Sequence, residues 1–208
     1  MTQDGRIARG DQTRQRILNH AMAIASQDGL EGLSIGRLAT DLGVSKSGLF
    51  AHFGSKEELQ TAVVTAACEV FGHEVIKPAL RTAPGLPRLI LLCEGWLNYS
   101  ERRVFPGGCF FYATGAEFDA RPGRIRDQLA RVRRDWLQLC EQTVEDAQRL
   151  GQLDAGVEPA QLVFELDALA AAGNSAALLL DDPVAYDRSR TGIRSRLRDL
   201  ATRPQEVP

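Results

Sequence analysis

Apolar residues recur every three or four positions along almost the whole 208-residue chain, and strand-like alternation of apolar and polar residues is absent. This spacing places apolar side chains on one face of a helix, so it favours helices over strands throughout. We therefore expect an all-α protein with about nine helices. By residue number, the expected helices are 13–28, 35–42, 46–52, 55–78, 89–102, 110–118, 122–150, 159–180 and 182–200.

Serine and proline residues mark the ends of several of these helices. Ser34, Ser45 and Ser55 each precede a periodic segment and are expected to cap it, with Glu58 completing a capping box after Ser55. Pro78 is expected to stop or kink the helix that Ser55 opens, because proline removes a backbone donor.

The composition is that of a globular protein that folds in a reducing compartment. An apolar content of 44% is enough for a packed core at this length. The first residues contain no apolar run and the cysteines form no CxxC pair, so we expect a cytoplasmic protein without structural disulfides. No histidine lies at a zinc-ligand spacing from a cysteine, so neither a metal site nor a cofactor is expected.

The most apolar stretch, residues 157–180, is not expected to cross a membrane. It contains Glu165, Asp167 and Asn174, which a helix in lipid would not tolerate cheaply. We therefore expect a soluble protein.

Residues 34–53 read SIGRLATDLGVSKSGLFAHF and predict a helix-turn-helix. Gly43 would supply the left-handed turn, Ala39 is small where the second helix crosses, and Leu49 would pack back between the helices. An ordinary helical hairpin has the same spacing and is the alternative interpretation of these residues taken alone.

The residues around this motif resemble the TetR (TetR/AcrR) family of bacterial transcription regulators. The resemblance covers residues 13–63, and the chain departs from the family pattern at Ser34, Asp41 and Phe50. Phe50 replaces a tyrosine whose hydroxyl often contacts phosphate in the family. The segments that carry the resemblance are Arg14-Gln-Arg-Ile17-Leu18, Ser34-Ile35, Leu38-Ala39, Leu42-Gly43-Val44-Ser45, Gly48-Leu49-Phe50, His52-Phe53 and Ser55-Lys56-Glu57-Glu58-Leu59.

The resemblance implies a three-helix DNA-binding domain followed by a helical domain for effector binding and dimerisation. We place the two domains at residues 1–56 and 57–208. The function it implies is that of a homodimeric, sequence-specific regulator, a repressor that a small-molecule ligand releases from a palindromic operator in double-stranded DNA. The distant alternative is a helical enzyme or ligand carrier, but no nucleophile–base pair, phosphate-binding loop or metal cluster supports catalysis.

The first residues of a recognition helix read base edges in the major groove, which here selects Ser45, Lys46, Ser47 and Gly48. Phosphate contacts are expected from the flanking positions. The complete set of expected DNA-binding residues is Ser34, Arg37, Ser45, Lys46, Ser47, Gly48, Phe50, His52 and Lys56. The arginines at 6 and 9 form either an arm in the minor groove or a solvated tail.

A net charge of −2 is low for a DNA-binding protein. Residues 1–60 contain seven basic and seven acidic residues, so no strongly basic domain is hidden in the average. We therefore expect few neutralised phosphates and binding that depends on geometry and dimerisation.

The helix expected at 159–180 is apolar on nearly all sides, which predicts two packing partners: its own core and a second subunit. With the last helix it would form a four-helix bundle between subunits. A central helix in a monomer is the alternative. The expected dimer residues are Leu166, Leu169, Ala170, Gly173, Asn174, Ala177, Ile193 and Leu197.

Eight of the 13 aromatic residues lie between positions 96 and 136, which predicts either an aromatic-lined pocket or a well-filled core. A ligand there is expected to shift the helix at 55–80 and so to move the DNA-binding domains. Cys109 follows two glycines near a helix start, so an oxidant or electrophile switch at Cys109 is an alternative to ligand binding, and a small apolar filler is another. The expected ligand-binding residues are Trp96, Tyr99, Phe105, Cys109, Phe110, Tyr112, Trp136 and Cys140.

Overall fold

Residues 3–207 are described by a computed structural model, apart from the side chains of residues 3–9 and 11. The arm expected at the arginines 6 and 9 therefore lies outside the described side chains. Between residues 3 and 207 the structure contains helices and an isolated bridge between Leu153 and Ala201, but no strand. The α-helices are α1 (Gln3–Asp28), α2 (Ile35–Leu42), α3 (Lys46–Phe53), α4 (Lys56–Phe71), α5 (Lys77–Leu80), α6 (Leu86–Glu101), α7 (Phe110–Phe118), α8 (Arg124–Arg149), α9 (Pro159–Leu179) and α10 (Ala185–Leu200).

The all-α prediction is confirmed, and so is the number of helices when continuous segments are counted once. A π-helical turn at Gly72–Ile76 joins α4 to α5, so this stretch forms one irregular helix. Pro78 lies two residues after this π-turn and has no N–H to donate to a preceding carbonyl, so it cannot continue the α-helical hydrogen-bond pattern. The irregularity expected at Pro78 is therefore a π-turn just before it.

Two helices begin earlier than the periodicity predicts. The first begins at Gln3 rather than near residue 13, because its first three turns are polar and carry no apolar pattern to detect. The helix α6 begins at Leu86, with Pro87 in its first turn, where the fixed φ of proline suits a helix start. Pro87 is thus part of α6 and not of the loop expected before residue 89.

The three predicted serine caps are present. The hydroxyl Oγ atoms of Ser34, Ser45 and Ser55 accept from the backbone N–H three residues later, at 3.0, 3.1 and 3.1 Å. Each bond satisfies a donor that a helix start leaves without a partner in its own helix. The serines therefore fix where α2, α3 and α4 begin.

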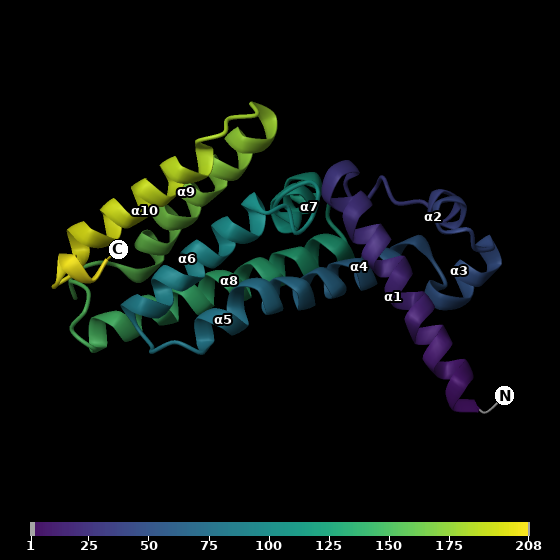
Figure 1. Cartoon of the computed structure of the whole chain (residues 1–208), viewed down its shortest axis with the longest axis horizontal. Helices are drawn as coiled ribbons and strands as arrows, with labels where there is room; N and C mark the ends of the chain where they lie inside the picture. The colour runs from purple at the N-terminus through teal and green to yellow at the C-terminus, as the bar shows by residue number, and fades with distance from the viewer. Residues whose placement is uncertain (1–2, 208) are drawn as a thin grey trace. The chain divides into compact units, whose positions relative to one another are not determined.

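The chain packs into two compact units. Unit 1 consists of Met1–Glu69 and Phe105–Ala130, and unit 2 of Val70–Val104 and Arg131–Pro208. The helices α4 and α8 each continue from one unit into the other (Figure 1). The expected division between residues 56 and 57 does not coincide with these packing units and stays a prediction.

Unit 1 has a core of aliphatic side chains from α1 to α4. Ile17, Leu38, Leu49 and Leu59 are fully buried in it. Helix α7 also belongs to this unit, because the carboxylate of Glu117 binds backbone N–H groups after α1. The predicted helix-turn-helix thus forms part of a unit that includes a segment distant in sequence.

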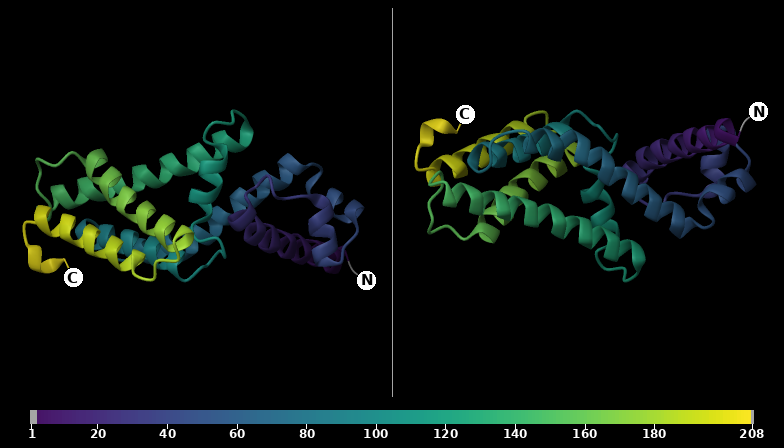
Figure 2. Two further views of the ribbon diagram at one scale, coloured as in Figure 1. Left: turned by 90° about the horizontal axis from the view of Figure 1, so that it is seen from above. Right: turned by 90° about the horizontal axis from the view of Figure 1, so that it is seen from below.

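Unit 2 has a core formed by α6, α9 and α10 together with the part of α8 after Ala130. Leu89, Leu97, Leu162 and Leu197 are fully buried in it. Figures 1 and 2 show α9 and α10 side by side, and the two helices approach closely because Gly173 faces Ser189. A methyl group at Gly173 would lie 2.1 Å from the Ser189 hydroxyl, so only glycine fits.

Candidate functional site

The helix-turn-helix is built as its sequence predicts. Gly43 ends α2 in the left-handed conformation, with φ of 65° and ψ of 33°. The backbone N–H of Val44 donates to the carbonyl of Ala39 at 3.0 Å, which closes the turn. Ala39 and Leu49 are buried, as their packing roles require.

One end of α3 is exposed. Ser45, Lys46 and Ser47 are exposed at its start, and Phe50 lies one turn later with half of its surface exposed. The residues that sequence analysis selected for base contacts are therefore together on one surface.

Gly36 is part of this surface, although the sequence pattern did not single it out. A methyl group at Gly36 would lie 3.6 Å from Cε of Lys46, so the stem of Lys46 passes close to the start of α2. The packing of α2 on α3 thereby restricts the region that the Lys46 ammonium can reach.

The basic residues expected at phosphates are already paired with acidic residues. Lys56 Nζ lies 3.0 Å from Glu31 Oε2, and Arg37 Nη1 lies 2.6 Å from Asp28 Oδ2. The hydrogen bonds from Lys56 and then from Gln60 hold the pKa of the Glu31 carboxyl below its ordinary value. A phosphate would have to replace these carboxylates, which reduces the net gain of each contact.

Arg14 positions the end of α3. Its Nη1 donates to the backbone carbonyl of His52 at 2.9 Å, and its guanidinium lies 4.5 Å from the centroid of the Phe53 ring. Phe53 is buried, as expected of a packing residue, and His52 is half-buried beside it. This role of Arg14 was not predictable from a local pattern, since its contact with His52 joins positions 38 residues apart.

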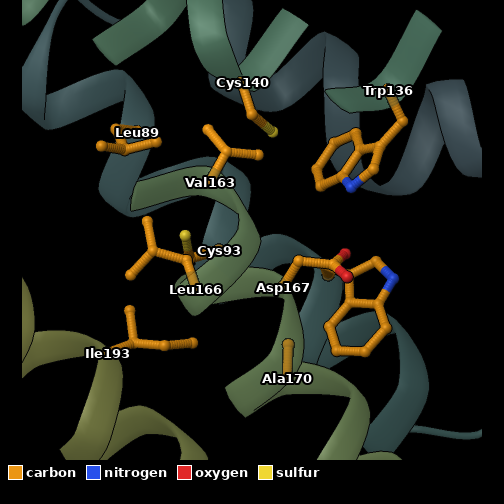
Figure 3. Close-up of a pocket in the computed structure, with 10 residues that line it drawn as sticks. Leu89, Cys93, Trp136, Cys140, Val163, Leu166, Asp167, Ala170 and Ile193 are labelled. Atoms are coloured by element: carbon orange, nitrogen blue, oxygen red, sulfur yellow. The ribbon is translucent and has the colours of Figure 1, made fainter. Parts of the chain in front are cut away.

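A cavity of about 30 Å³ opens in unit 2, measured as the space available to the centre of a water molecule. Trp96, Trp136 and Cys140 line it, as expected of ligand-binding residues. Tyr99 is in the same unit but is fully buried and packs edge-on against Phe71, with ring centroids 5.3 Å apart. The complete lining is Leu89, Cys93, Trp96, Trp136, Cys140, Val163, Leu166, Asp167, Ala170 and Ile193 (Figure 3).

The other four expected ligand-binding residues are Phe105, Cys109, Phe110 and Tyr112, and they belong to unit 1. The rings of Phe105 and Phe110 pack against each other there, with centroids 5.5 Å apart. Cys109 is 1% exposed, so its thiol is not accessible to a reagent in this conformation. The structure therefore does not bring the aromatic residues of the 96–136 segment into one pocket.

Asp167 is the charged residue of the cavity that sequence analysis did not select. Its carboxylate pairs with the guanidinium of Arg133, and its side chain is 17% exposed. Asp167 shares a helix face with Val163 and Ala170, at spacings of four and three residues, and both line the cavity. An acidic residue on an otherwise apolar helix face was the signal that could have revealed it.

Cys93 also lines the cavity, and its thiol is strongly disfavoured as a thiolate. Burial, followed by the charges of Glu94 and Asp167, raises the pKa of Cys93 to about 12. Burial also raises the pKa of Cys140. Neither thiol of the cavity has the lowered pKa that a reactive cysteine needs.

The residues expected at a dimer interface are mostly inside the single chain. Leu166, Ala170 and Ile193 line the cavity, and Gly173 packs on α10. Asn174, Ala177 and Leu197 are also buried, whereas Leu169 is half-buried. Except for Leu169, all the expected dimer residues are therefore out of reach of a partner subunit in this conformation. Because α9 is apolar all round, its sequence does not distinguish the face that α6 and α10 cover from the face left exposed.

The exposed face of α9 is a different stripe. Phe164 and Leu179 are 68% and 79% exposed, and the side chains between them on this face are small. The exposed α9 stripe consists of Phe164, Ala168, Ala172, Ser175 and Leu179. An apolar stripe of this length in water indicates a protein contact.

On length and composition alone, α9 could cross a membrane. The helix also packs against α10 and carries two charged side chains, Glu165 and Asp167, each paired with an arginine. A single helix of this kind is weak evidence for a membrane span, because core helices pass the same test. Among the residues that the structure describes, no group of three or more histidine, cysteine or acidic side chains could hold a metal ion.

Two family models match the chain. Residues 17–63 match the model of the bacterial regulatory proteins of the tetR family, and residues 85–193 match that of the tetracyclin repressor-like C-terminal domain. The second match covers more than half of the chain. No curated protein matches the sequence.

Solved structures with the same fold match over nearly the whole chain. A TetR transcriptional regulator from Chloroflexus aurantiacus has a TM-score of 0.85 at 22% identity, covering 93% of this chain and 98% of its own. AibR, in complex with isovaleryl coenzyme A and operator DNA, has a TM-score of 0.69 at 18% identity, with 90% and 97% covered. A regulator from Saccharomonospora viridis in complex with choline has a TM-score of 0.71 at 22% identity, with 93% and 100% covered. The TM-scores show a shared fold, and at these low identities the similarity shows the fold alone.

Proposed function

The chain belongs to the TetR family of bacterial regulatory proteins, and from this premise we propose that it is a homodimeric repressor released from a palindromic operator by a small molecule. The observation that carries the proposal is the exposed start of α3. Family members are transcriptional regulators rather than enzymes, so we assign the chain no catalytic role and no cofactor. We place it in the cytoplasm, where such a regulator meets DNA.

Specific contacts to DNA would come from the exposed start of α3. The ammonium of Lys46 suits guanine O6 and N7, and the hydroxyls of Ser45 and Ser47 suit base edges or phosphate. Phe50 would contact a thymine methyl or a sugar, since its exposed ring has no hydroxyl for a phosphate. The main chain at Gly48 would come close to the DNA, and His52 would stay at the edge of this surface.

Contacts to phosphate would come from the other expected positions after local rearrangement. Lys56 and Arg37 would exchange Glu31 and Asp28 for phosphate oxygens. The capping hydroxyl of Ser34, at the start of α2, would donate to another phosphate. Since each exchange gives up an ion pair, we expect a shallow dependence of affinity on salt.

Dimerisation would bury the exposed α9 stripe. Its small residues, Ala168, Ala172 and Ser175, allow a second helix to approach closely, and Phe164 and Leu179 would anchor the two ends. The packing of α9 against α10 within one chain supplies half of a four-helix bundle. Two DNA-binding units in such a dimer would contact half-sites roughly 34–36 Å apart, or a multiple of that distance.

Helix α8 would transmit ligand binding to the DNA-binding unit. Its later part carries Trp136 and Cys140 into the cavity. Its first part holds α4 within unit 1, because Arg124 pairs with Glu58 and Gln128 Nε2 donates to Thr65 Oγ1 at 3.1 Å. A ligand that shifts α8 would therefore move α4 and the half-site spacing, for which a coupling of about 1–3 kcal/mol suffices.

Selection of bound DNA from a random library tests the proposal, followed by gel shifts on the selected sequence. The double variant Lys46→Ala/Ser47→Ala is expected to lose discrimination between the selected site and random DNA. A matched double variant in unit 2, Lys77→Ala/Ser195→Ala, removes the same side-chain types away from α3 and is expected to keep it. Wild-type affinity and specificity in the first variant would reject the assignment of α3 as the recognition helix.

A further inference from the structure

The cavity in unit 2 combines two indole rings with one carboxylate. Trp96 and Trp136 contribute the rings and Asp167 the charge, while the remaining lining is almost entirely aliphatic or thiol. In the view of Figure 3, Asp167 and Trp136 lie toward one edge of the cavity, with Leu89, Leu166 and Ile193 toward the other. An indole ring attracts a cation that lies over its face, and a carboxylate attracts a cation at its oxygens, so this lining offers two kinds of partner to a cation.

The raised pKa of the Cys93 thiol indicates negative charge beside it. After burial, the two causes that raise its pKa are the charges of Glu94 and Asp167, and both are negative. The Glu94 side chain is 18% exposed and forms ion pairs with Arg190 and Arg194. An anion placed beside Cys93 would meet these carboxylates together with their arginine partners, so the preference for a cation depends on the pair of Asp167 with Arg133.

A ligand cation would compete with Arg133 for Asp167. The Arg133 side chain does not line the cavity and is 40% exposed, so its long stem can extend into solvent. Asp167 is 17% exposed on a short side chain and stays with α9. A ligand cation that replaces the guanidinium keeps the Asp167 carboxylate paired, whereas an anionic ligand would be repelled by this carboxylate.

We propose that this cavity binds a compact quaternary ammonium group, held between Trp96, Trp136 and Asp167 in place of the Arg133 guanidinium. A cavity of about 30 Å³ has room for a head group of a few heavy atoms. Methylated ammonium suits such a site better than a primary amine, because it is weakly hydrated and has an apolar surface for the aliphatic wall. The proposal specifies the effector and in that respect rests on the proposed function.

Neighbours in fold do not decide the ligand class. Those with bound effectors include one with an acyl coenzyme A, an anion, and one with choline, a cation. Only the lining of this chain's own cavity discriminates between these charges. The carboxylate of Asp167, with an exchangeable partner, is the discriminating feature.

The test compares three probes of similar shape and different charge: tetramethylammonium, tert-butanol and pivalate. Trp96 and Trp136 are the two tryptophans of the chain, so intrinsic tryptophan fluorescence reports on the cavity. Titration of the purified full chain without DNA is expected to show tetramethylammonium binding about tenfold tighter than tert-butanol. Pivalate is expected to bind most weakly.

Two variants with opposite expected effects complete the test. Asp167→Asn is expected to remove the preference for tetramethylammonium over tert-butanol. Arg133→Gln is expected to tighten tetramethylammonium binding several-fold, because the competing guanidinium is gone. The control Arg134→Gln removes the same charge from an exposed neighbour on α8. It is expected to leave the affinities for tetramethylammonium and tert-butanol unchanged.

Equal affinities of the wild-type chain for tetramethylammonium and tert-butanol would overturn the proposal, and this comparison needs no variant to fold. Tightest binding of pivalate, lost in Arg133→Gln, would also overturn it and assign an anionic ligand. Because these titrations contain no DNA, their failure is distinct from a failure to select an operator.

Discussion

The carboxylate of Glu117 accepts a hydrogen bond from the backbone N–H of Leu30 at 2.7 Å, across 87 residues of sequence. Its second oxygen accepts from the N–H of Glu31 at 2.8 Å. Both donors lie just after Gly29, where α1 ends in a left-handed conformation. One side chain of α7 thus supplies acceptors for the turn that leads into the helix-turn-helix.

Replacing Glu117 by glutamine should destabilise unit 1. An amide keeps one acceptor oxygen but loses the charge and places an N–H₂ group opposite a backbone donor. We expect Glu117→Gln to lower the free energy of unfolding by about 1–3 kcal/mol in urea denaturation. The control Asp119→Asn changes an exposed carboxylate of the following turn and should stay close to wild type. Equal stabilities of the two variants would contradict this role of Glu117.

A second close contact within unit 1 predicts a contrast between two glycines. A methyl group at Gly107 would lie 1.8 Å from the carbonyl oxygen of Ser26, whereas one at Gly115, in the middle of α7, would have nothing within 4 Å. Gly107→Ala should therefore destabilise the protein by at least about 1 kcal/mol, since backbone must move. Gly115→Ala should raise the stability by about 0.5–1 kcal/mol through helix propensity. Thermal unfolding of both variants distinguishes the effects, and a stable Gly107→Ala would show that the turn moves freely.

Much of unit 1 could be predicted because its information is local. Serine caps, the turn at Gly43 and the helix period each act over a few residues, and the structure confirms all three. The pairing of Lys56 with Glu31 joins positions 25 residues apart, so no pattern in the sequence indicated that an expected phosphate ligand has a competing carboxylate.

The cavity was predicted only in part because its lining depends on how helices pack. Trp96, Trp136 and Cys140 were expected, whereas Asp167 and Cys93 become its neighbours only through the packing of α6, α8 and α9. Helix packing also explains why the exposed α9 stripe was not predicted. The sequence of a helix that is apolar on all sides does not reveal which face its own core covers.

The ion pair of Lys56 predicts how DNA affinity responds to salt. Lys56→Ala should weaken binding to selected and random DNA alike, and reduce the slope of log K against log salt by less than about 1, because Lys56 gives up Glu31 to reach a phosphate. Glu31→Gln should raise affinity at low salt, because Lys56 no longer exchanges a carboxylate for phosphate. Fluorescence anisotropy over a series of salt concentrations measures both slopes. An unchanged slope in Lys56→Ala would remove this residue from the phosphate contacts.

The exposed α9 stripe predicts where a charge disrupts self-association. Phe164→Asp should convert a dimer into a monomer in light scattering after size-exclusion chromatography, because the charge would be buried at an apolar contact. Leu150→Asp alters another exposed apolar side chain, at the end of α8, and should leave the dimer intact. Because Phe164 is exposed in the single chain, its replacement should not impair folding. A dimeric Phe164→Asp variant would exclude the stripe as the interface.

The cavity thiols predict a loss of stability in alkali. Folding raises the pKa of Cys93 from its ordinary value of 9.0 to about 12, chiefly through burial, so the folded protein disfavours the thiolate. Below about pH 9 the thiol is protonated in both states and its contribution to stability does not change with pH. Above that pH the unfolded chain releases the proton first, so the free energy of unfolding should fall between about pH 9 and 12. Urea denaturation at several pH values should show a smaller fall in Cys93→Ala than in Cys68→Ala, where the half-buried thiol of α4 serves as the control. An equal fall in both variants would show that the Cys93 thiol ionises as readily in the folded chain as in the unfolded one.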